Sequence, residues 1–67
     1  MTNQEWIIEA ANNDRAALLD GIKGIYNCLD AYVDVDGRVW MSNPQVGHWL
    51  DDDGIARIVK SLKAGDI

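Results

Sequence analysis

Residues 31–42, AYVDVDGRVWMS, set the arrangement that the rest of the chain has to fit. Apolar and polar residues alternate along this stretch, and it is rich in Val and aromatic residues. Both features are typical of β-strands. Gly37 interrupts the alternation with a residue that accepts the left-handed conformation of a tight turn. The stretch therefore predicts two antiparallel strands joined by a short loop.

The length of that loop sets which residues face each other. A three-residue loop would pair Tyr32 with Trp40, whereas a two-residue turn at Asp36-Gly37 would pair Val33 with Trp40. We favour the longer loop because it gathers the apolar side chains on one face of the hairpin, and register follows the hydrophobic pattern. The pairs expected from it are Asp34 with Arg38 and Tyr32 with Trp40. The apolar face then consists of Ala31, Val33, Val39 and Met41.

The order DVDG at residues 34–37 also resembles part of a calcium-binding loop. In an EF-hand the conserved glycine is the sixth residue, so Tyr32 would be the first and Asn43 the twelfth. Those positions need an Asp and a bidentate Glu, and the chain has neither there. The hairpin interpretation is favoured, and no metal ligands are assigned.

Helices are predicted on both sides of the hairpin. Thr2 and Glu5 have the spacing of a capping box, which predicts a first helix over residues 3–11 that ends at Asn12-Asn13. Asp14 is expected to cap a second helix. Its apolar stripe, at spacings of three and four, is Leu18, Leu19, Ile22, Ile25, Tyr26 and Leu29.

The C-terminal part begins with residues 43–50, which Pro44 and Gly47 predict to be a loop. A helix is then expected from the aspartates at 51–53 to Gly65. The predicted fold is α+β, with two N-terminal helices, a β-hairpin and a C-terminal helix around one small core. Residues 1–67 are expected to form a single compact domain, as suits a chain of 67 residues.

No residue pattern predicts catalysis. Cys28 and His48 are the only residues of their kinds, so neither a disulfide nor a Cys/His zinc site can form within the chain. A Cys28–His48 nucleophile pair lacks a third group to orient the histidine. We therefore assign no catalytic, cofactor-binding or metal-binding residues, and we expect the protein not to be an enzyme and to need no cofactor.

The net charge of −5 comes from an excess of acidic residues in the N-terminal part. Residues 1–37 hold seven acidic residues against two basic ones, whereas residues 38–67 hold four of each. Such a charge disfavours direct nucleic-acid binding, which needs Lys and Arg at the phosphates. The N-terminus lacks a signal-peptide pattern and no segment is apolar enough to cross a bilayer, so a cytoplasmic protein is expected.

A short acidic chain with a TNQEW start at residues 2–6 and a VDVDGRVW hairpin at residues 33–40 resembles the anti-CRISPR proteins of bacteriophages and mobile elements. It is most similar in character to small inhibitors of type I surveillance complexes. This resemblance implies that the chain acts in the bacterial host cell. There it would bind a basic, nucleic-acid-binding surface with carboxylates that mimic DNA phosphates.

The residues expected to bind the partner are the acidic residues of the N-terminal part, together with two aromatic residues. Tyr32 and Trp40 are either interface anchors or are covered by the first helix or by residues 43–50. The alternative function is a small phage accessory or antitoxin-like domain that binds a protein through apolar and aromatic surface. A monomer is expected in both cases. The acidic set is Glu5, Glu9, Asp14, Asp20, Asp30, Asp34 and Asp36.

Overall fold

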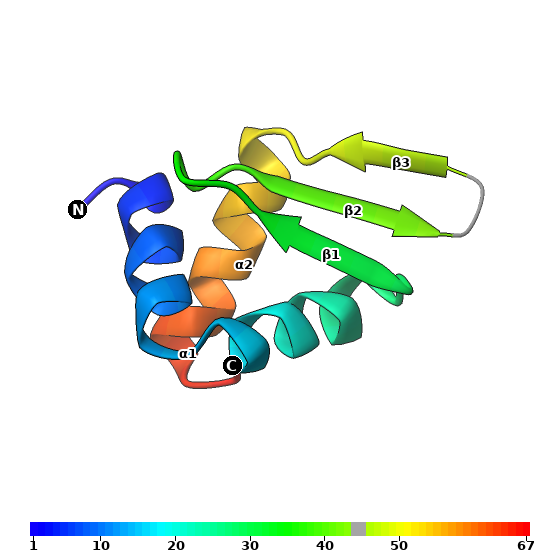
Figure 1. The fold of residues 1–67 in the computed structure, drawn as a ribbon. Coiled ribbons are helices and arrows are strands. Elements are labelled where there is room, and N and C mark those ends of the chain that lie inside the picture. Colours follow the sequence, from blue (N-terminus) through cyan, green and yellow to red (C-terminus); the bar gives the residue numbers. More distant parts are fainter. Residues whose placement is uncertain (44–45) are drawn as a thin grey trace.

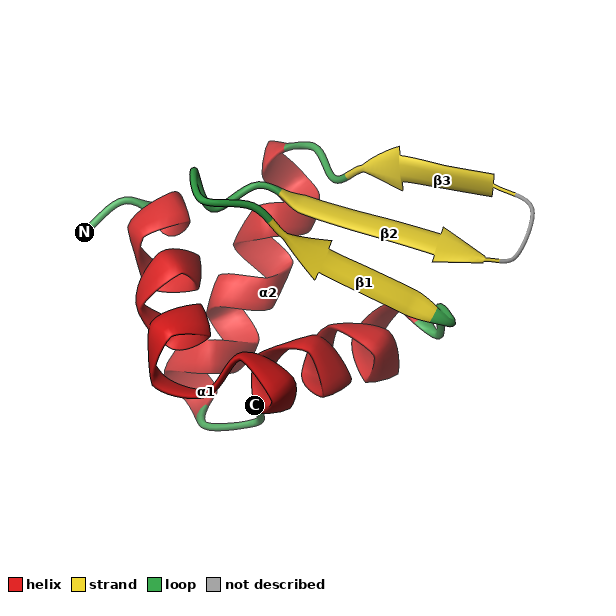
Figure 2. Cartoon of the chain, in the orientation of Figure 1, coloured by secondary structure: helices red, strands yellow, loops and turns green. Residues whose placement is uncertain are grey.

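The structure is a computed structural model that describes residues 1–43 and 46–67. Two helices and a three-stranded antiparallel sheet follow one another along the chain, and the strands lie in the order β1-β2-β3 (Figure 1). The elements are α1 (Asn3–Tyr26), β1 (Asp30–Val33), β2 (Val39–Asn43), β3 (Val46–Trp49) and α2 (Asp52–Ala64). Both helices lie on the same side of the sheet (Figure 2).

The predicted arrangement of two N-terminal helices, a hairpin and a C-terminal helix is wrong in two places. The N-terminal segment is one helical element of 24 residues, and the sheet has a third strand. Only Asp14 departs from helical angles within α1, with φ −158° and ψ 88°, so the helix bends there and resumes at once. The Asn12-Asn13 pair does not end it, because both residues remain helical.

The ends of α1 are closed by hydrogen bonds. The predicted capping box is confirmed: the Glu5 N–H donates to the Thr2 hydroxyl, and the Thr2 N–H donates to the Glu5 carboxylate. At the bend, the Asp14 carboxylate accepts from the N–H of Ala17, which satisfies a backbone donor that the bend leaves without a helical partner. Asn27 ends the helix in the left-handed conformation, with φ 51°.

The hairpin has the predicted register. Tyr32 pairs with Trp40, and the Asp34 N–H donates to the Arg38 carbonyl at 3.0 Å. Gly37 is left-handed, with φ 80°, and a side chain there would collide with the backbone of α1, because a Cβ atom would lie 2.6 Å from the Gln4 carbonyl oxygen. Glycine is therefore required at this turn for both its angles and its size.

The second correction concerns residues 43–50, which were predicted to be a loop. Residues 46–49 form β3, which pairs with β2 so that Trp40 faces Trp49 and Met41 faces His48. The predicted turn at Pro44 lies outside the described residues. Gly47 was taken as a second loop signal, but in the strand it makes room for a neighbouring indole, because a Cβ atom there would lie 2.4 Å from Cζ2 of Trp40.

The core lies between the helices and the inner face of the sheet. The predicted C-terminal helix is confirmed as α2: the Asp51 carboxylate accepts from the Gly54 N–H at its start, and left-handed Gly65 ends it. Its buried residues pack with those of α1 and of the sheet. The largest fully buried side chains are Ile7, Leu18, Ile22, Val33, Val39 and Ile58.

Candidate interaction surface

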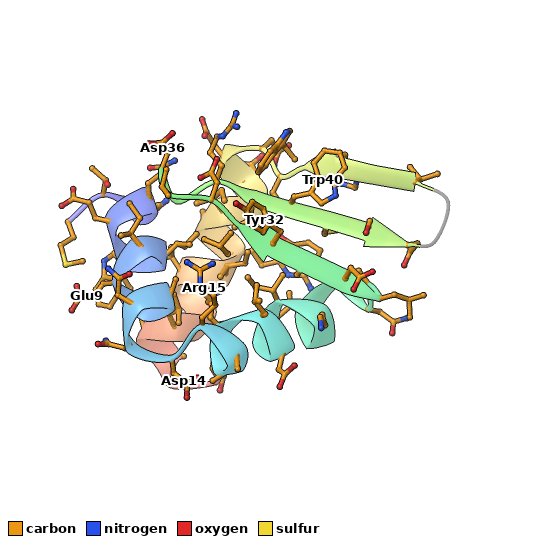
Figure 3. The ribbon with its side chains drawn as sticks, viewed as in Figure 1. Glu9, Asp14, Arg15, Tyr32, Asp36 and Trp40 are labelled. Carbon is orange, nitrogen blue, oxygen red and sulfur yellow. The ribbon has the colours of Figure 1, made fainter. Side chains whose placement is uncertain are left out.

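The outer face of the sheet, opposite the helices, carries an aromatic row made of Tyr32, Trp40 and Trp49. The register places the three residues directly side by side, one on each strand. Figure 3 shows Tyr32 and Trp40 on the same side of neighbouring strands. Tyr32 is 55% exposed and Trp49 40% exposed, while Trp40 is half-buried between them. The structure therefore leaves uncovered the aromatic surface that sequence reasoning could not place.

The two indoles fix each other's orientation. Their ring centroids lie 5.3 Å apart with the planes at 77°, which is the favourable edge-to-face arrangement of aromatic rings. The Trp40 indole also lies against Gly47, where any side chain would displace it. Trp40 is thus held by its neighbours rather than free to change rotamer.

Arg38 and Asp34 extend the aromatic row with charged groups. The Arg38 guanidinium lies 4.2 Å from the centroid of the Trp49 ring, and its Nε is 2.8 Å from Oδ2 of Asp34. The same carboxylate accepts from the backbone N–H groups of Asp36 and Arg38. The hydrogen bond from Arg38 and these backbone donors hold the pKa of Asp34 below its ordinary value. Asp34 therefore positions Arg38 over Trp49.

We call the five residues Tyr32, Asp34, Arg38, Trp40 and Trp49 the outer-face cluster. Sequence reasoning identified Tyr32, Trp40 and Asp34 as candidates but missed the other two. Trp49 was assigned to a loop, so its pairing with Trp40 could not be foreseen. The four residues Val46–Trp49 do not alternate clearly between apolar and polar, so the sequence carried no strong signal for this strand.

The acidic set does not gather at one place in the structure. Asp34 and Asp36 lie together at the hairpin loop, joined by a hydrogen bond from the Asp36 N–H. Figure 3 shows Glu9, Asp14 and Asp36 pointing in different directions, from the middle of the first half of α1, from its bend and from the hairpin loop. Asp20 and Asp30 are exposed on α1 and at the start of β1.

Two carboxylates of the set have local structural roles. Glu5 is fully exposed, and its hydrogen bonds with the backbone and hydroxyl of Thr2 lower its pKa. Asp14 is engaged at the bend of α1 by the Ala17 N–H. Each carboxylate accepts a hydrogen bond from a backbone N–H that has no partner within the helix.

A hollow of about 260 Å³ lies between the bend of α1 and the end of the chain. Trp6, Glu9, Asp14, Leu62 and Ile67 are among its lining residues. Small-molecule sites usually measure about 300 to 1,000 Å³ and enclose most of the ligand. This hollow is smaller than that range, so it does not provide a substrate site.

The two residues considered for nucleophilic chemistry lie apart in the fold. The thiol of Cys28 is buried next to the start of β1, whereas His48 is exposed on β3, on the far side of β2. Within residues 1–43 and 46–67, no group of three His, Cys, Asp or Glu side chains is arranged to hold a metal ion. In the same ranges, no helix has the length and apolar character needed to span a membrane.

Comparison of the chain with protein-family models, with curated proteins and with solved structures found no match. The function has to be inferred from the geometry described above.

Proposed function

We propose that this protein is a small protein-interaction domain, of the accessory or antitoxin-like kind found in phages, that binds a partner protein through its outer-face cluster. The observation that carries the proposal is the exposed aromatic row across all three strands. Tyr, Trp and Arg are the residues most enriched among those that dominate binding energy at protein interfaces. The domain acts in the bacterial cytoplasm and performs no catalysis of its own.

A protein fits the cluster better than a nucleic acid or a sugar does. Bases and sugars stack on open, flat ring faces, but the Trp40 and Trp49 planes stand at 77° and the Arg38 guanidinium covers the Trp49 ring. Arg38 is itself paired with Asp34, so it offers little charge to a phosphate. A chain with a net charge of −5 also repels nucleic acid.

Charge favours a basic partner. Asp30, Asp34 and Asp36 lie on β1 and on the loop that follows it, next to the aromatic row. Surface potentials of opposite sign accelerate association and select partners, while the desolvated aromatic contacts supply most of the affinity. The partner is expected to place a basic rim around an apolar patch that receives Tyr32 and Trp49.

Site-specific photocrosslinking in a bacterial cell tests the docking surface. A benzophenone amino acid replaces Tyr32 in one variant and Ala56, which is exposed on α2, in another. We expect a protein adduct from position 32 and none from position 56. Adding Trp49→Ala to the first variant should abolish the adduct, whereas Val35→Ala, at an 88% exposed position of the hairpin loop, should preserve it. Adducts from position 56 alone would refute the proposal.

A second candidate function is inhibition of a type I CRISPR surveillance complex by carboxylates that take the place of DNA phosphates. One observation supports it: in the part of the chain that the structure describes, Asp34 is the only acidic residue in an ion pair. The other carboxylates of the acidic set keep their charge unopposed at close range. In this mode the basic surface of the complex is the partner, and the aromatic row is an anchor.

Salt and charge reversal separate the two functions. A purified type I surveillance complex serves as the probe, and affinity is measured at increasing ionic strength. DNA mimicry predicts a steep loss of affinity with salt, since screening weakens exposed charge pairs. It also predicts that the double variant Glu9→Lys, Asp20→Lys no longer binds. The control is Asp66→Lys, which changes an exposed acidic residue outside the acidic set and should have a small effect. Binding that resists both salt and charge reversal excludes mimicry.

A further inference from the structure

The outer edge of β3 presents unpaired backbone groups. The Leu50 N–H donates to the Val39 carbonyl at 2.8 Å, which identifies Val39 and Leu50 as a hydrogen-bonded pair. Such pairs alternate along antiparallel strands, so Met41 with His48 is also a hydrogen-bonded pair. Gly47 and Trp49 therefore direct their N–H and C=O groups away from β2, to the open edge.

Neither helix covers this edge. In the described ranges, β3 makes its substantial contacts with β2 alone, and Figure 1 shows it at the border of the sheet, away from α1. Natural proteins protect open edges with charged residues, especially Lys, or with Pro, which has no backbone N–H. The residues of β3, Val46 to Trp49, include none of these, and Val46 is 70% exposed.

The other edge of the sheet is protected. There the Arg15 guanidinium donates to the Val33 carbonyl at 3.0 Å, and α1 packs along β1. Figure 3 shows Arg15 between α1 and β1. Of the two edge strands in the described part of the chain, β3 is therefore the one left open to another strand.

We propose that β3 pairs antiparallel with β3 of a second copy of this chain. A two-fold axis at His48 places Gly47 of each copy opposite Trp49 of the other, and the outward N–H and C=O groups of both residues then exchange hydrogen bonds. The pairing continues the sheet from three strands to six. It also joins the outer faces of the two copies into one surface.

The strand is complementary to itself in shape and charge. Trp49 is the bulkiest residue of β3 and Gly47 the smallest, and both belong to the outer face. Each Trp49 indole of one copy therefore meets Gly47 of the other, together with the Trp40 indole that lies over that glycine. The rim of Trp40, which lies against Gly47, is then available for aromatic contact. No carboxylate lies on β3, so the net charge of −5 creates no like-charged pair directly across the junction.

The proposed register places His48 of each copy opposite His48 of the other. The two residues form a non-hydrogen-bonded pair, with their Cα atoms about 4.5 Å apart. His48→Glu and His48→Lys each place two like charges there, and each variant should remain a single chain. Mixed in equal amounts, they place Glu opposite Lys and should recover the pair. His48 is exposed, so both variants are expected to fold, and circular dichroism checks this.

Analytical ultracentrifugation measures the outcome. The mass of the wild-type protein should rise with concentration from 7.4 kDa to twice that value. Each His48 variant should stay at the mass of one chain, and their mixture should regain the doubled mass. The matched controls Ala56→Glu and Ala56→Lys change the net charge equally on an exposed position of α2, and both should associate like the wild type.

Three results would overturn the proposal. They are a wild type that stays at the mass of one chain at every concentration, His48 variants that associate as the wild type does, and a mixture that fails to recover the pair. The proposed function is tested separately. Crosslinking at Tyr32 detects a partner on the outer face of the sheet, whereas ultracentrifugation detects association through the β3 edge.

Discussion

The same strands form the two faces of the sheet, but the inner face is buried in the core and the outer face is exposed to solvent. On the inner face, Val33 is 1% exposed and Val39 is fully buried, and among residues 1–43 and 46–67 no polar or charged side chain is buried. On the outer face, the next residues along the same strands, Tyr32 and Trp40, form the aromatic row. Because successive side chains of a strand point to opposite faces, the fold separates stabilisation from recognition residue by residue. Each face can therefore be altered while the other is kept.

The largest effect on stability is expected on the inner face. Val39→Ala removes buried methyl groups from a fully enclosed position and should lower the free energy of unfolding by roughly 2 kcal/mol. A domain of this size has a total of about 3 to 10 kcal/mol. Urea unfolding followed by circular dichroism measures the change. Val35→Ala, at an 88% exposed position, is the control and should shift the midpoint little; equal losses for the two variants would contradict the comparison.

The next largest effect on stability is expected for Gly47→Ala, which disturbs packing on the outer face. The new Cβ atom would meet the Trp40 indole, which has to rotate away from Trp49. Overpacking of this kind costs about 1 to 3 kcal/mol, and here the indole can relieve part of it. We expect a loss near the lower limit, with a changed near-ultraviolet circular dichroism spectrum as the indoles lose their edge-to-face contact. An unchanged spectrum would show that the contact does not order the row.

Tyr32→Ala should separate the two faces most clearly. Tyr32 is 55% exposed and its side chain leaves the core intact, so the loss of stability is expected to be below about 1 kcal/mol. Binding of the crosslinked partner should nevertheless be lost, since an interface depends on a few aromatic anchors. Urea unfolding and affinity are measured on the same variant. A large loss of stability with binding retained would reverse the assignment of the two faces.

The smallest effect concerns the ion pair at the margin of the outer face. Arg38 lowers the pKa of Asp34, so the charged carboxylate favours the folded state above the ordinary pKa of about 3.9. That contribution is lost as the pH falls through the lowered value, when the carboxylate becomes protonated. In Arg38→Gln, the pKa of Asp34 should move back up, as followed by the chemical shift of its carboxyl carbon. The pKa of Glu5, which Thr2 lowers, should not move and serves as the internal reference.

The sequence predicted correctly those parts of the fold that depend on neighbouring residues, which are the hairpin register and α2. The hairpin register follows from Gly37 and from the segregation of Val33 and Val39, and α2 follows from its caps and its stripe of apolar residues. β3 was missed because its four residues include a glycine and carry no strong strand pattern of their own. That strand exists because β2 offers it hydrogen bonds and Trp40 fills the space above Gly47, and neither condition is local.

The candidate site was predicted only in part for the same reason: some of its contacts are local in the sequence and others depend on β3. Tyr32 and Trp40 could be paired from the hairpin alone, but their exposure depended on whether a distant segment covers them. Trp49 entered the row only with β3, and Arg38 took its place over that ring. The predicted Asp14 cap is present, because its carboxylate accepts from the Ala17 N–H, but the predicted helix end at Asn12-Asn13 is wrong: Asp14 bends the helix without ending it.

Arg15 follows directly after that bend, and its hydrogen bond to the Val33 carbonyl makes the β1 edge of the sheet different from the β3 edge. A sheet whose two borders both accept strands can add copies without limit and grow into a fibre. Here α1 packs along the β1 border and Arg15 bonds to its Val33 carbonyl, so the proposed strand addition at β3 is expected to proceed only once. With β1 covered in this way, an assembly through the β3 edge would end at two copies.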